Sequence, residues 1–350
     1  MAERRGWRDH PLTQLTLVRS LEFIREPEAL FWTFVFPVLL TAGLGLAFRS
    51  RPVEVVPVGV LAEATAPAAV ALGSDPRVAV RPLGDSAAAQ ALRTGKVAVL
   101  VVPGAAGGVT YRFDEARPEA RAARALVDDI LQRAAGRTDP MAVREEKVSE
   151  RGSRYVDFLV PGLIAMNLMS TGIWGIGFNL VDQRRKKLLK RMVATPMPRS
   201  HYLLSFVLSR IGWLILEVAV LLGFGLWVFG VPLRGSLGTF TVSALLGALM
   251  FGGLGLLIAS RARTIEGASG LMNLVMLPMW VFSGVFFSAG NFPEVMQPLI
   301  QALPLTAAVD ALRMVMLEGA TLGQAGPELA IMGAWLVGTF ALALRLFRWQ

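Results

Sequence analysis

The sequence contains no cysteine and only two histidines, His10 and His201, among its 350 residues. Disulfide bonds, a thiol nucleophile and a thiolate metal site are therefore excluded. Charged residues are also scarce at 17%, whereas soluble domains carry about 25%. Because 54% of the residues are hydrophobic and the mean hydropathy is +0.53, the composition predicts an integral membrane protein.

A phosphate-binding Gly-x-x-x-x-Gly-Lys-Ser/Thr loop is missing too, so we expect this chain neither to hydrolyse ATP nor to bind a cofactor itself. No paired carboxylates or Ser/His/Asp grouping suggests catalysis in the polar part of the chain. The net charge of +9 could indicate nucleic acid, but most basic residues flank apolar segments, where they set membrane topology. A nucleic-acid partner is therefore not expected.

Six apolar segments have the length of about 20 residues that a membrane-spanning helix needs. They predict a polytopic α-helical membrane protein with six transmembrane helices. The segments are Ala29–Phe48, Val156–Val181, Tyr202–Val231, Ser236–Ser260, Ala268–Ala289 and Leu329–Leu344.

The distribution of Lys and Arg predicts the orientation of these spans. Long translocated domains do not follow the charge rule, so the polar insert at 49–155 is left aside. With the N-terminus in the cytosol, all other basic residues except Arg234 and Arg313 fall on the cytosolic side. Both termini are therefore expected inside and the insert outside.

The N-terminal residues 1–27 are expected to be cytosolic and to include an amphipathic helix over Pro11–Glu26. Leu17, Val18, Leu21 and Ile24 share one face of it. One interpretation places this helix along the inner membrane surface, and the other makes it a plain extension of the first span.

The insert at 49–155 predicts a small α/β domain with the order strand, helix, strand, helix, strand, strand, helix. Its role stays open between a passive spacer and a gate or docking domain over an exit path. The segments that support it are the strands Val53–Leu61, Lys96–Val102 and Val109–Phe113 and the helices Asp85–Thr94 and Arg117–Ala135.

The loop at 182–200, DQRRKKLLKRMVATPMPRS, is a dense basic block between spans two and three. Leu188, Leu189 and Met192 form a short apolar ridge at helical spacing. A charged helix with such a ridge is suited to dock on a soluble protein under the membrane. Topology control together with contact to lipid headgroups is the alternative, and the two roles can coexist.

Outside the membrane, residues 291–319 are apolar but interrupted by Pro293, Pro298 and Pro304, which break any long helix. Two short re-entrant helices are predicted, the second over Leu305–Leu317. Asp310 and Arg313 are three residues apart and could pair as a structural salt bridge at the interface. The alternative is that this hairpin closes an outer gate, with Pro304, Asp310 and Arg313 as the gate residues.

Glu217 is the acidic residue that lies deep in a predicted span, where a charge requires a partner or water. It faces either a translocation cavity or dimer seam, or other helices through hydrogen bonds. Asn167 and Asn179 in span two and Asn273 in span five are weaker candidates of the same kind.

Three segments together resemble the membrane subunits of type-2 ATP-binding-cassette (ABC) exporters. They are Arg25–Gly45 with its Phe-Pro interruption, Leu188–Arg210 with its Thr-Pro turn, and Ser283–Gly319. The resemblance implies a permease subunit paired with a second copy or paralogue, and two cytosolic ATPase subunits that bind ATP and Mg²⁺. It also implies a location in a bacterial-type inner membrane.

In that family the loop between spans two and three forms a coupling helix, which here would cover about Asp182–Met192. Many members have an acidic start to this loop, whereas the basic start here implies an acidic groove on the ATPase. The residues that the resemblance assigns to coupling are Arg184, Arg185, Lys187, Leu188, Leu189, Arg191, Met192, Thr195 and Pro196.

The resemblance leaves the cargo open among drugs, lipids and polysaccharides. Polysaccharide exporters of this type generally lack a large external insert, which favours an amphipathic small molecule or a lipid. The rival hypothesis is a membrane-anchored sensor or scaffold whose external domain binds a ligand. A secondary transporter is disfavoured because the spans lack inverted repeats and several ionisable residues.

Overall fold

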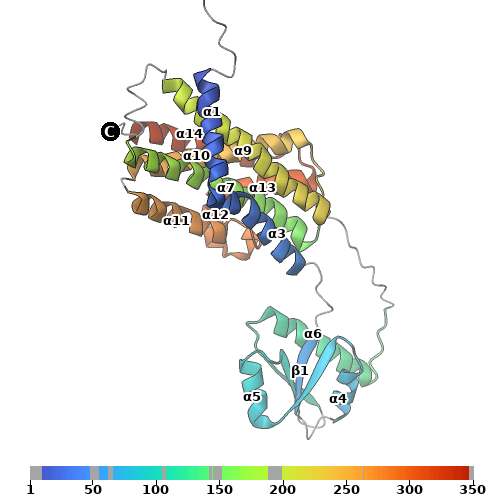
Figure 1. Ribbon diagram of the computed structural model, residues 1–350. Coiled ribbons are helices and arrows are strands. Elements are labelled where there is room, and N and C mark those ends of the chain that lie inside the picture. Colours follow the sequence, from blue (N-terminus) through green and yellow to red (C-terminus); the bar gives the residue numbers. More distant parts are fainter. Residues whose placement is uncertain are drawn as a thin grey trace, which may run out of the picture. The chain divides into compact units, whose positions relative to one another are not determined.

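The computed structural model describes residues 10–47, 55–61, 66–104, 108–141, 144, 152–187, 199–262 and 264–346. The chain divides into two compact units (Figure 1). Residues 1–49 and 149–350 form a helical membrane unit, and residues 50–148 form an inserted α/β unit. A small α/β unit between the first two long apolar helices is what the sequence predicts.

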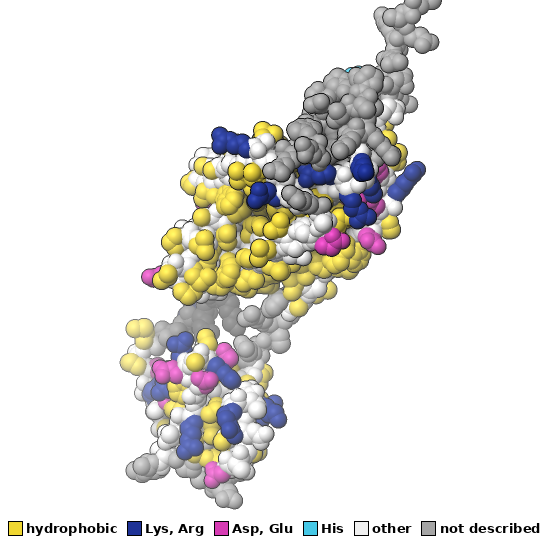
Figure 2. All heavy atoms as spheres, turned by 90° about the vertical axis from the view of Figure 1, so that its left-hand side faces the viewer, with side chains coloured by type: hydrophobic (Ala, Val, Ile, Leu, Met, Phe, Trp, Pro, Cys, Tyr) yellow, Lys and Arg dark blue, Asp and Glu magenta, His cyan; other side chains and the backbone are white. Residues whose placement is uncertain are grey.

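Six helices in the described part of the chain are long and apolar enough to cross a membrane. Figure 2 shows hydrophobic side chains covering the flank of the helical unit, as a surface that faces lipid requires. The six are Pro27–Ala47 (elements α2, η2 and α3), α7 (Tyr155–Arg185), Leu208–Val228 within α9 (Arg199–Val228), α10 (Leu237–Arg261), α11 (Ile265–Phe282) and α14 (Gly326–Leu346).

The third and fifth spans end earlier than predicted, because the backbone turns before the apolar pattern stops. The fifth helix, α11, ends at Phe282 rather than Ala289, since Gly284 has a φ of 75°. The third, α9, ends at Val228, and Gly230 follows with a φ of 62°. Glycine adopts such left-handed angles without steric cost and so ends a helix within an apolar run.

The first span contains a local irregularity. After α2 (Pro27–Leu30), the segment η2 (Phe31–Val35) is a π-helix, and α3 (Phe36–Ala47) continues the span. Pro37 has no N–H to donate to the carbonyl of Thr33 four residues earlier, so this carbonyl needs another donor. The irregularity therefore leaves a backbone acceptor within the membrane unit.

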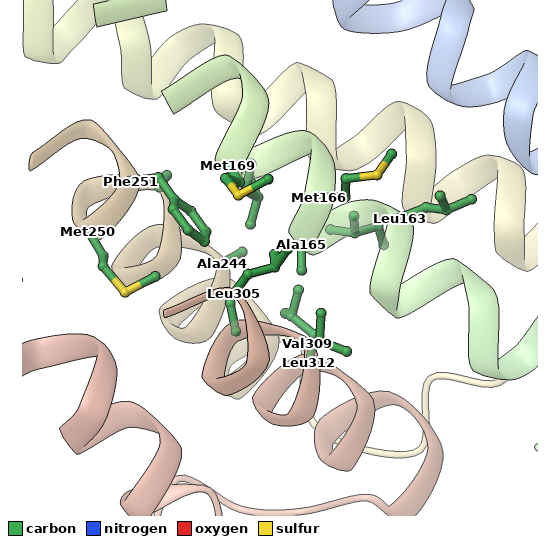
Figure 3. Close-up of a cluster of buried hydrophobic side chains, with 14 of the residues drawn as sticks. Leu163, Ala165, Met166, Met169, Ala244, Met250, Phe251, Leu305, Val309 and Leu312 are labelled. Atoms are coloured by element: carbon green, nitrogen blue, oxygen red, sulfur yellow. The ribbon is translucent and has the colours of Figure 1, made fainter. Parts of the chain in front are cut away.

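The helix α7 lies at the centre of the membrane unit and packs most extensively on α10. Figure 3 shows Met169 of α7 beside Phe251 of α10, and Ala165 of α7 near Leu305 of α13 (Pro304–Arg313). Ala244, Ala248 and Gly252 recur every four residues on α10 and are buried within this core. Small residues at this spacing let neighbouring helices approach closely.

The outer segment forms the predicted pair of short helices. Glu294–Ala302, which comprises η5 (Glu294–Met296) and α12 (Gln297–Ala302), is bent by 84° from Pro304–Glu318. The second arm comprises α13 and the π-helix η6 (Met314–Glu318). The bend falls at Pro304, which occupies the first position of α13, where a missing N–H costs nothing.

The inserted unit has the predicted order of elements and folds around a mixed four-stranded sheet, β2-β1-β3-β4. Strand β1 is parallel to β2 and β3, and β4 is antiparallel to β3. Val58, Val60, Val101, Leu72 and Val127 form the centre of its core. The elements are β1 (Val56–Leu61), α4 (Ala66–Gly73), β2 (Val78–Leu83), α5 (Asp85–Arg93), β3 (Val99–Pro103), β4 (Val109–Phe113) and α6 (Pro118–Ala134).

The N-terminal helix α1 (Pro11–Arg25) is separated from the first span by Glu26, whose φ of −101° and ψ of 90° are extended. The interpretation of this segment as a plain extension of the span is therefore wrong. Arg19 Nε donates to Ser205 Oγ of α9 at 2.9 Å, and Ser20 Oγ lies 3.4 Å from Ser209 Oγ. The predicted apolar face, Leu17, Val18, Leu21 and Ile24, is half exposed.

Candidate functional site

A buried polar cluster joins the second and third spans at Glu217. Its carboxylate is 1% exposed and accepts hydrogen bonds from Asn167 Nδ2 at 2.8 Å and Thr171 Oγ1 at 2.9 Å. Arg210, two turns earlier on α9, lies 3.3 Å from the second carboxylate oxygen and also donates to Thr171. The charge of Glu217 is therefore matched by a cation and by two neutral donors.

The cluster extends to the first span through Asn167. Its Nδ2 also donates to the carbonyl of Thr33 at 3.3 Å, the acceptor that the π-helix beside Pro37 leaves without its usual N–H. Three spans therefore meet through one asparagine. An irregular backbone at membrane depth is tolerated where other helices supply hydrogen bonds in this way.

The burial of this cluster shows how Glu217 is held within one chain. Glu217 and Asn167 are 1% and 4% exposed, and both take part in hydrogen bonds between helices. A role at a translocation cavity or dimer seam stays a prediction. The sequence pattern identifies Glu217 as a candidate, but its partners Asn167 and Thr171 lie on another helix, 50 and 46 positions away.

The other two asparagines lie differently. Asn179 on α7 is exposed and donates to the carbonyl of Gly175 one turn earlier at 2.7 Å. Asn273 on α11 is exposed as well, beside the exposed Gly270. Since α7 and α11 pack together, these polar side chains belong to neighbouring spans. Exposed amides on membrane helices are suited to bind a polar partner or water.

At the basic loop, the predicted coupling helix over Asp182–Met192 needs a correction. Asp182–Arg185 form the last turn of α7, and Lys186 and Lys187 leave the helix, the latter with a φ of 56°. The helix of the span thus extends further than the apolar pattern, because its charged last turn keeps helical hydrogen bonds. Leu188, Leu189, Arg191, Met192, Thr195 and Pro196 lie outside the described residues, so the apolar ridge stays a prediction.

The first two loop arginines point to different surroundings. Arg184 is partly buried, and its Nη1 donates to the carbonyls of Ala259 at 3.0 Å and Ala262 at 3.4 Å, at the end of α10. Arg185 and Lys187 are exposed. Of the coupling residues that the structure describes, one therefore binds a neighbouring span and two are exposed.

Arg313 is a partly buried side chain that connects several helices. Its guanidinium stacks 3.7 Å from the ring centroid of Phe158 and donates to the carbonyls of Phe158 at 3.2 Å and Gly284 at 2.9 Å. The predicted pair with Asp310 is present at 3.5 Å, and the Asp310 side chain is 46% exposed. Arg313 thus links α13 to the start of α7 and the end of α11.

The sequence missed a similar junction at Arg154. Asp157 is fully buried and accepts from the Arg154 side chain at 2.7 and 2.9 Å, which raises the pKa of Arg154 further above its usual value. The same guanidinium donates to the carbonyls of Phe229 at 2.9 Å and Gly230 at 3.2 Å. The i,i+3 spacing of Arg154 and Asp157 before an apolar run is the signal that could have found it.

Nothing in the described residues suggests a metal centre, since no group of three or more potential ligands comes together there. The features that can act are polar contacts between spans. They hold α7 to α9 at Glu217 and Arg154, to α10 at Arg184, and to α13 at Arg313.

These features define a multi-pass membrane protein built around one buried helix. Residues 27–345 match the model of the family described as "ABC-2 family transporter protein", and the chain belongs to this family. The match covers all six candidate spans and the insert between the first two.

Curated relatives have permease names. The chain is 25% identical over 169 residues to "Probable multidrug ABC transporter permease YbhR" of Escherichia coli, covering 48% of this chain and 46% of that protein. It is 27% identical over 206 residues to "Linearmycin resistance permease protein LnrN" of Bacillus subtilis, and the match covers 58% of this chain and 51% of that protein. It is 26% identical over 167 residues to "ABC transporter G family member 20" of Dictyostelium discoideum, and the match covers 48% of this chain and 23% of that protein. The chain spans about a quarter to a half of the length of these relatives.

Proposed function

We propose that this chain is the membrane-spanning permease subunit of an ATP-driven exporter, powered by two separate ABC ATPase subunits that bind ATP and Mg²⁺. The family match over residues 27–345 is the observation that carries the proposal. The basic loop between α7 and α9 supports it, because a charged segment at the end of a buried central helix is suited to receive force from a soluble partner.

The proposed orientation has both termini in the cytosol and the inserted unit outside, in a bacterial-type inner membrane. It follows from the placement of the basic residues at the ends of the spans. Export rather than import is inferred from the resemblance to type-2 exporters. The inserted unit has a core of its own, which suits a folded domain in the external medium.

A second copy or paralogue is proposed to complete the pathway. Asn179 and Asn273 support a contact or cavity along α7 and α11, since exposed amides in lipid would lack partners. The cargo is proposed to be an amphipathic small molecule or lipid leaving the cytoplasm or inner leaflet. The words "multidrug" and "linearmycin resistance" in the names of two relatives support this class.

The test is purification of the tagged chain from membranes of its native host. We expect an ATPase with a Gly-x-x-x-x-Gly-Lys-Ser/Thr loop to co-purify at equal stoichiometry and to hydrolyse ATP in the complex. Inverted vesicles that contain the complex should accumulate members of a panel of lipophilic dyes and fluorescent lipids when ATP is added.

The variants Arg185→Glu and Leu188→Glu should abolish ATP-driven accumulation, because both alter the loop proposed to contact the ATPase. Arg345→Glu, a charge reversal at the exposed end of α14, is the matched control and should retain accumulation. Full activity in both loop variants, or the absence of any ATPase from the purified complex, would favour the sensor or scaffold hypothesis instead.

A further inference from the structure

The contact between Arg184 and the end of α10 has a specific geometry. The last carbonyls of a helix have no intrahelical donor and carry partial negative charge. Arg184 Nη1 approaches Ala259 O at 3.0 Å and Ala262 O at 3.4 Å. Ala262 is the C-cap of α10, with an extended ψ of 131°. A cation from α7 thus caps the final turn of α10.

Further into the membrane unit, the same two helices touch through their backbones. A methyl group added to Gly172 would lie 2.7 Å from Phe251 Cβ, and one added to Gly255 would lie 2.8 Å from the carbonyl oxygen of Ile173. A methyl group on Gly177 would lie 3.0 Å from the carbonyl oxygen of Gly255. Such close approach allows little sliding, since packed interfaces repack in discrete steps rather than deform continuously.

The other helix that borders the loop is held differently. Residues 188–198 connect α7 to α9 along the chain, and α9 meets α7 over a smaller interface than α10 does. This interface contains the hydrogen bonds of Glu217 with Asn167 and Thr171. These contacts are between side chains, which can change rotamer, whereas the glycines bring the backbones of α7 and α10 together and leave less room for adjustment.

We propose that Arg184 is a positioning residue that locks the cytosolic end of α7 to that of α10, so that force on the loop moves both spans together relative to α9. This inference rests on the proposed function, because it requires an ATPase that acts on the loop. Arg184 acts through the carbonyls of α10 and not by touching the ATPase. Its neighbour Arg185, which is exposed, is left to face the partner.

The first arm of the test uses the full chain without any ATPase. Because the chain has no cysteine, Ser260→Cys gives one label site, on a residue that is 6% exposed in the last turn of α10. In lipid nanodiscs, Arg184→Ala should speed labelling of this cysteine by a polar maleimide by about tenfold, since the last turn of α10 loses its cap. Arg184→Lys should restore part of the protection.

Lys186→Ala is the matched control in this arm. Lys186 is two residues away, is exposed, and pairs with Asp182 of α7 at 2.7 Å, so its loss removes one positive charge and a contact with α7 itself. Its labelling rate should stay within about twofold of the parent. Equal labelling rates in Arg184→Ala and Lys186→Ala would overturn the proposal that Arg184 holds the end of α10.

The second arm uses the assembled complex with an environment-sensitive fluorophore on the same cysteine. MgATP should change its emission in the parent, and Arg184→Ala should reduce that change at least about fivefold while ATP hydrolysis continues. Arg184→Lys should recover part of the response, which loss of folding would not allow. An undiminished response in Arg184→Ala would overturn the transmission role. A parent that binds no ATPase would overturn the proposed function. The first arm would still show whether Arg184 holds the end of α10.

Discussion

Asn167 Nδ2 donates a hydrogen bond of 2.8 Å to Glu217 Oε1, and this contact connects the second span with the third. The same amide reaches the Thr33 carbonyl of the first span at 3.3 Å. A buried carboxylate in a helical membrane protein is costly unless each of its lone pairs has a donor. Here the donors come from both helices, so the cluster connects the two spans. Its contribution to the free energy of unfolding can be measured.

Replacement of Glu217 tests this connection. Glu217→Ala leaves Arg210 without its carboxylate partner inside the unit, and we expect a loss of about 3 kcal/mol in the free energy of unfolding. Glu217→Gln should lose less, because its amide oxygen still accepts from Asn167 and Thr171. The measurement is denaturant unfolding of the detergent-solubilised chain.

The double variant Glu217→Leu with Arg210→Met supplies the control for the charge. It removes both ions and fills the space with apolar atoms, so it should recover most of the stability that Glu217→Ala loses. A double variant as unstable as the single one would contradict the ion-pair explanation.

The glycines of α7 offer a second comparison. A methyl group on Gly172 meets Phe251 Cβ at 2.7 Å, whereas one on Gly175 meets nothing within 4 Å. Gly172→Ala should therefore destabilise the chain by about 1–3 kcal/mol through overpacking. Gly175→Ala should be neutral or stabilise it by up to about 1 kcal/mol through helix propensity. Thermal unfolding of the two variants measures both changes in stability, and the variants differ only in their position on α7. Similar shifts in the melting temperature would show that α7 and α10 separate easily.

The outline of this architecture follows from patterns that are local in the sequence. Apolar runs of the right length predict six spans, and alternating Val-rich strands and helices predict the inserted unit. Pro304 marks the bend of the outer hairpin, because a missing N–H acts at its own position. These features depend on residues close together in the chain.

The partners of the charged residues could not be predicted in the same way. Arg184, counted as a loop residue, binds carbonyls 75 and 78 positions away, and Arg313 binds a carbonyl 155 positions away. Backbone carbonyls carry no signature in the sequence, so neither contact leaves a pattern to detect. Early helix ends such as that of α11 are equally hidden, since Gly284 lies in an apolar stretch and only its φ shows the turn.

The inserted unit makes a prediction about pH through Tyr111. Burial and a hydrogen bond to Asp128 Oδ1 at 3.1 Å raise the pKa of Tyr111 from 10.0 to about 12. Because the folded pKa is raised, the stabilisation by this phenol is complete below pH 10 and is lost as the pH rises towards 12. Ultraviolet difference titration of the chain against Tyr111→Phe isolates this phenol among the three tyrosines.

Asp128→Asn is the matched variant for this titration. It removes the negative charge that disfavours tyrosinate but leaves the burial, so the pKa of Tyr111 should fall part of the way back to 10.0. A midpoint at 10.0 in the parent would show that the phenol is solvated and that its bond to Asp128 is absent.

Arg313 allows the gate and the structural role to be separated. Its guanidinium holds the carbonyls of Phe158 and Gly284 and covers the Phe158 ring, so Arg313→Ala leaves buried acceptors without donors. We expect a loss of about 2–4 kcal/mol in the free energy of unfolding, with Arg313→Lys in between, because an ammonium cannot reproduce the planar stacking. Asp310→Asn should cost less than about 1 kcal/mol, since this side chain is 46% exposed. Denaturant unfolding of the three variants tests the structural role of Arg313. If Arg313→Ala unfolds like the parent but alters dye accumulation in inverted vesicles, Arg313 acts as a gate and not as a structural link.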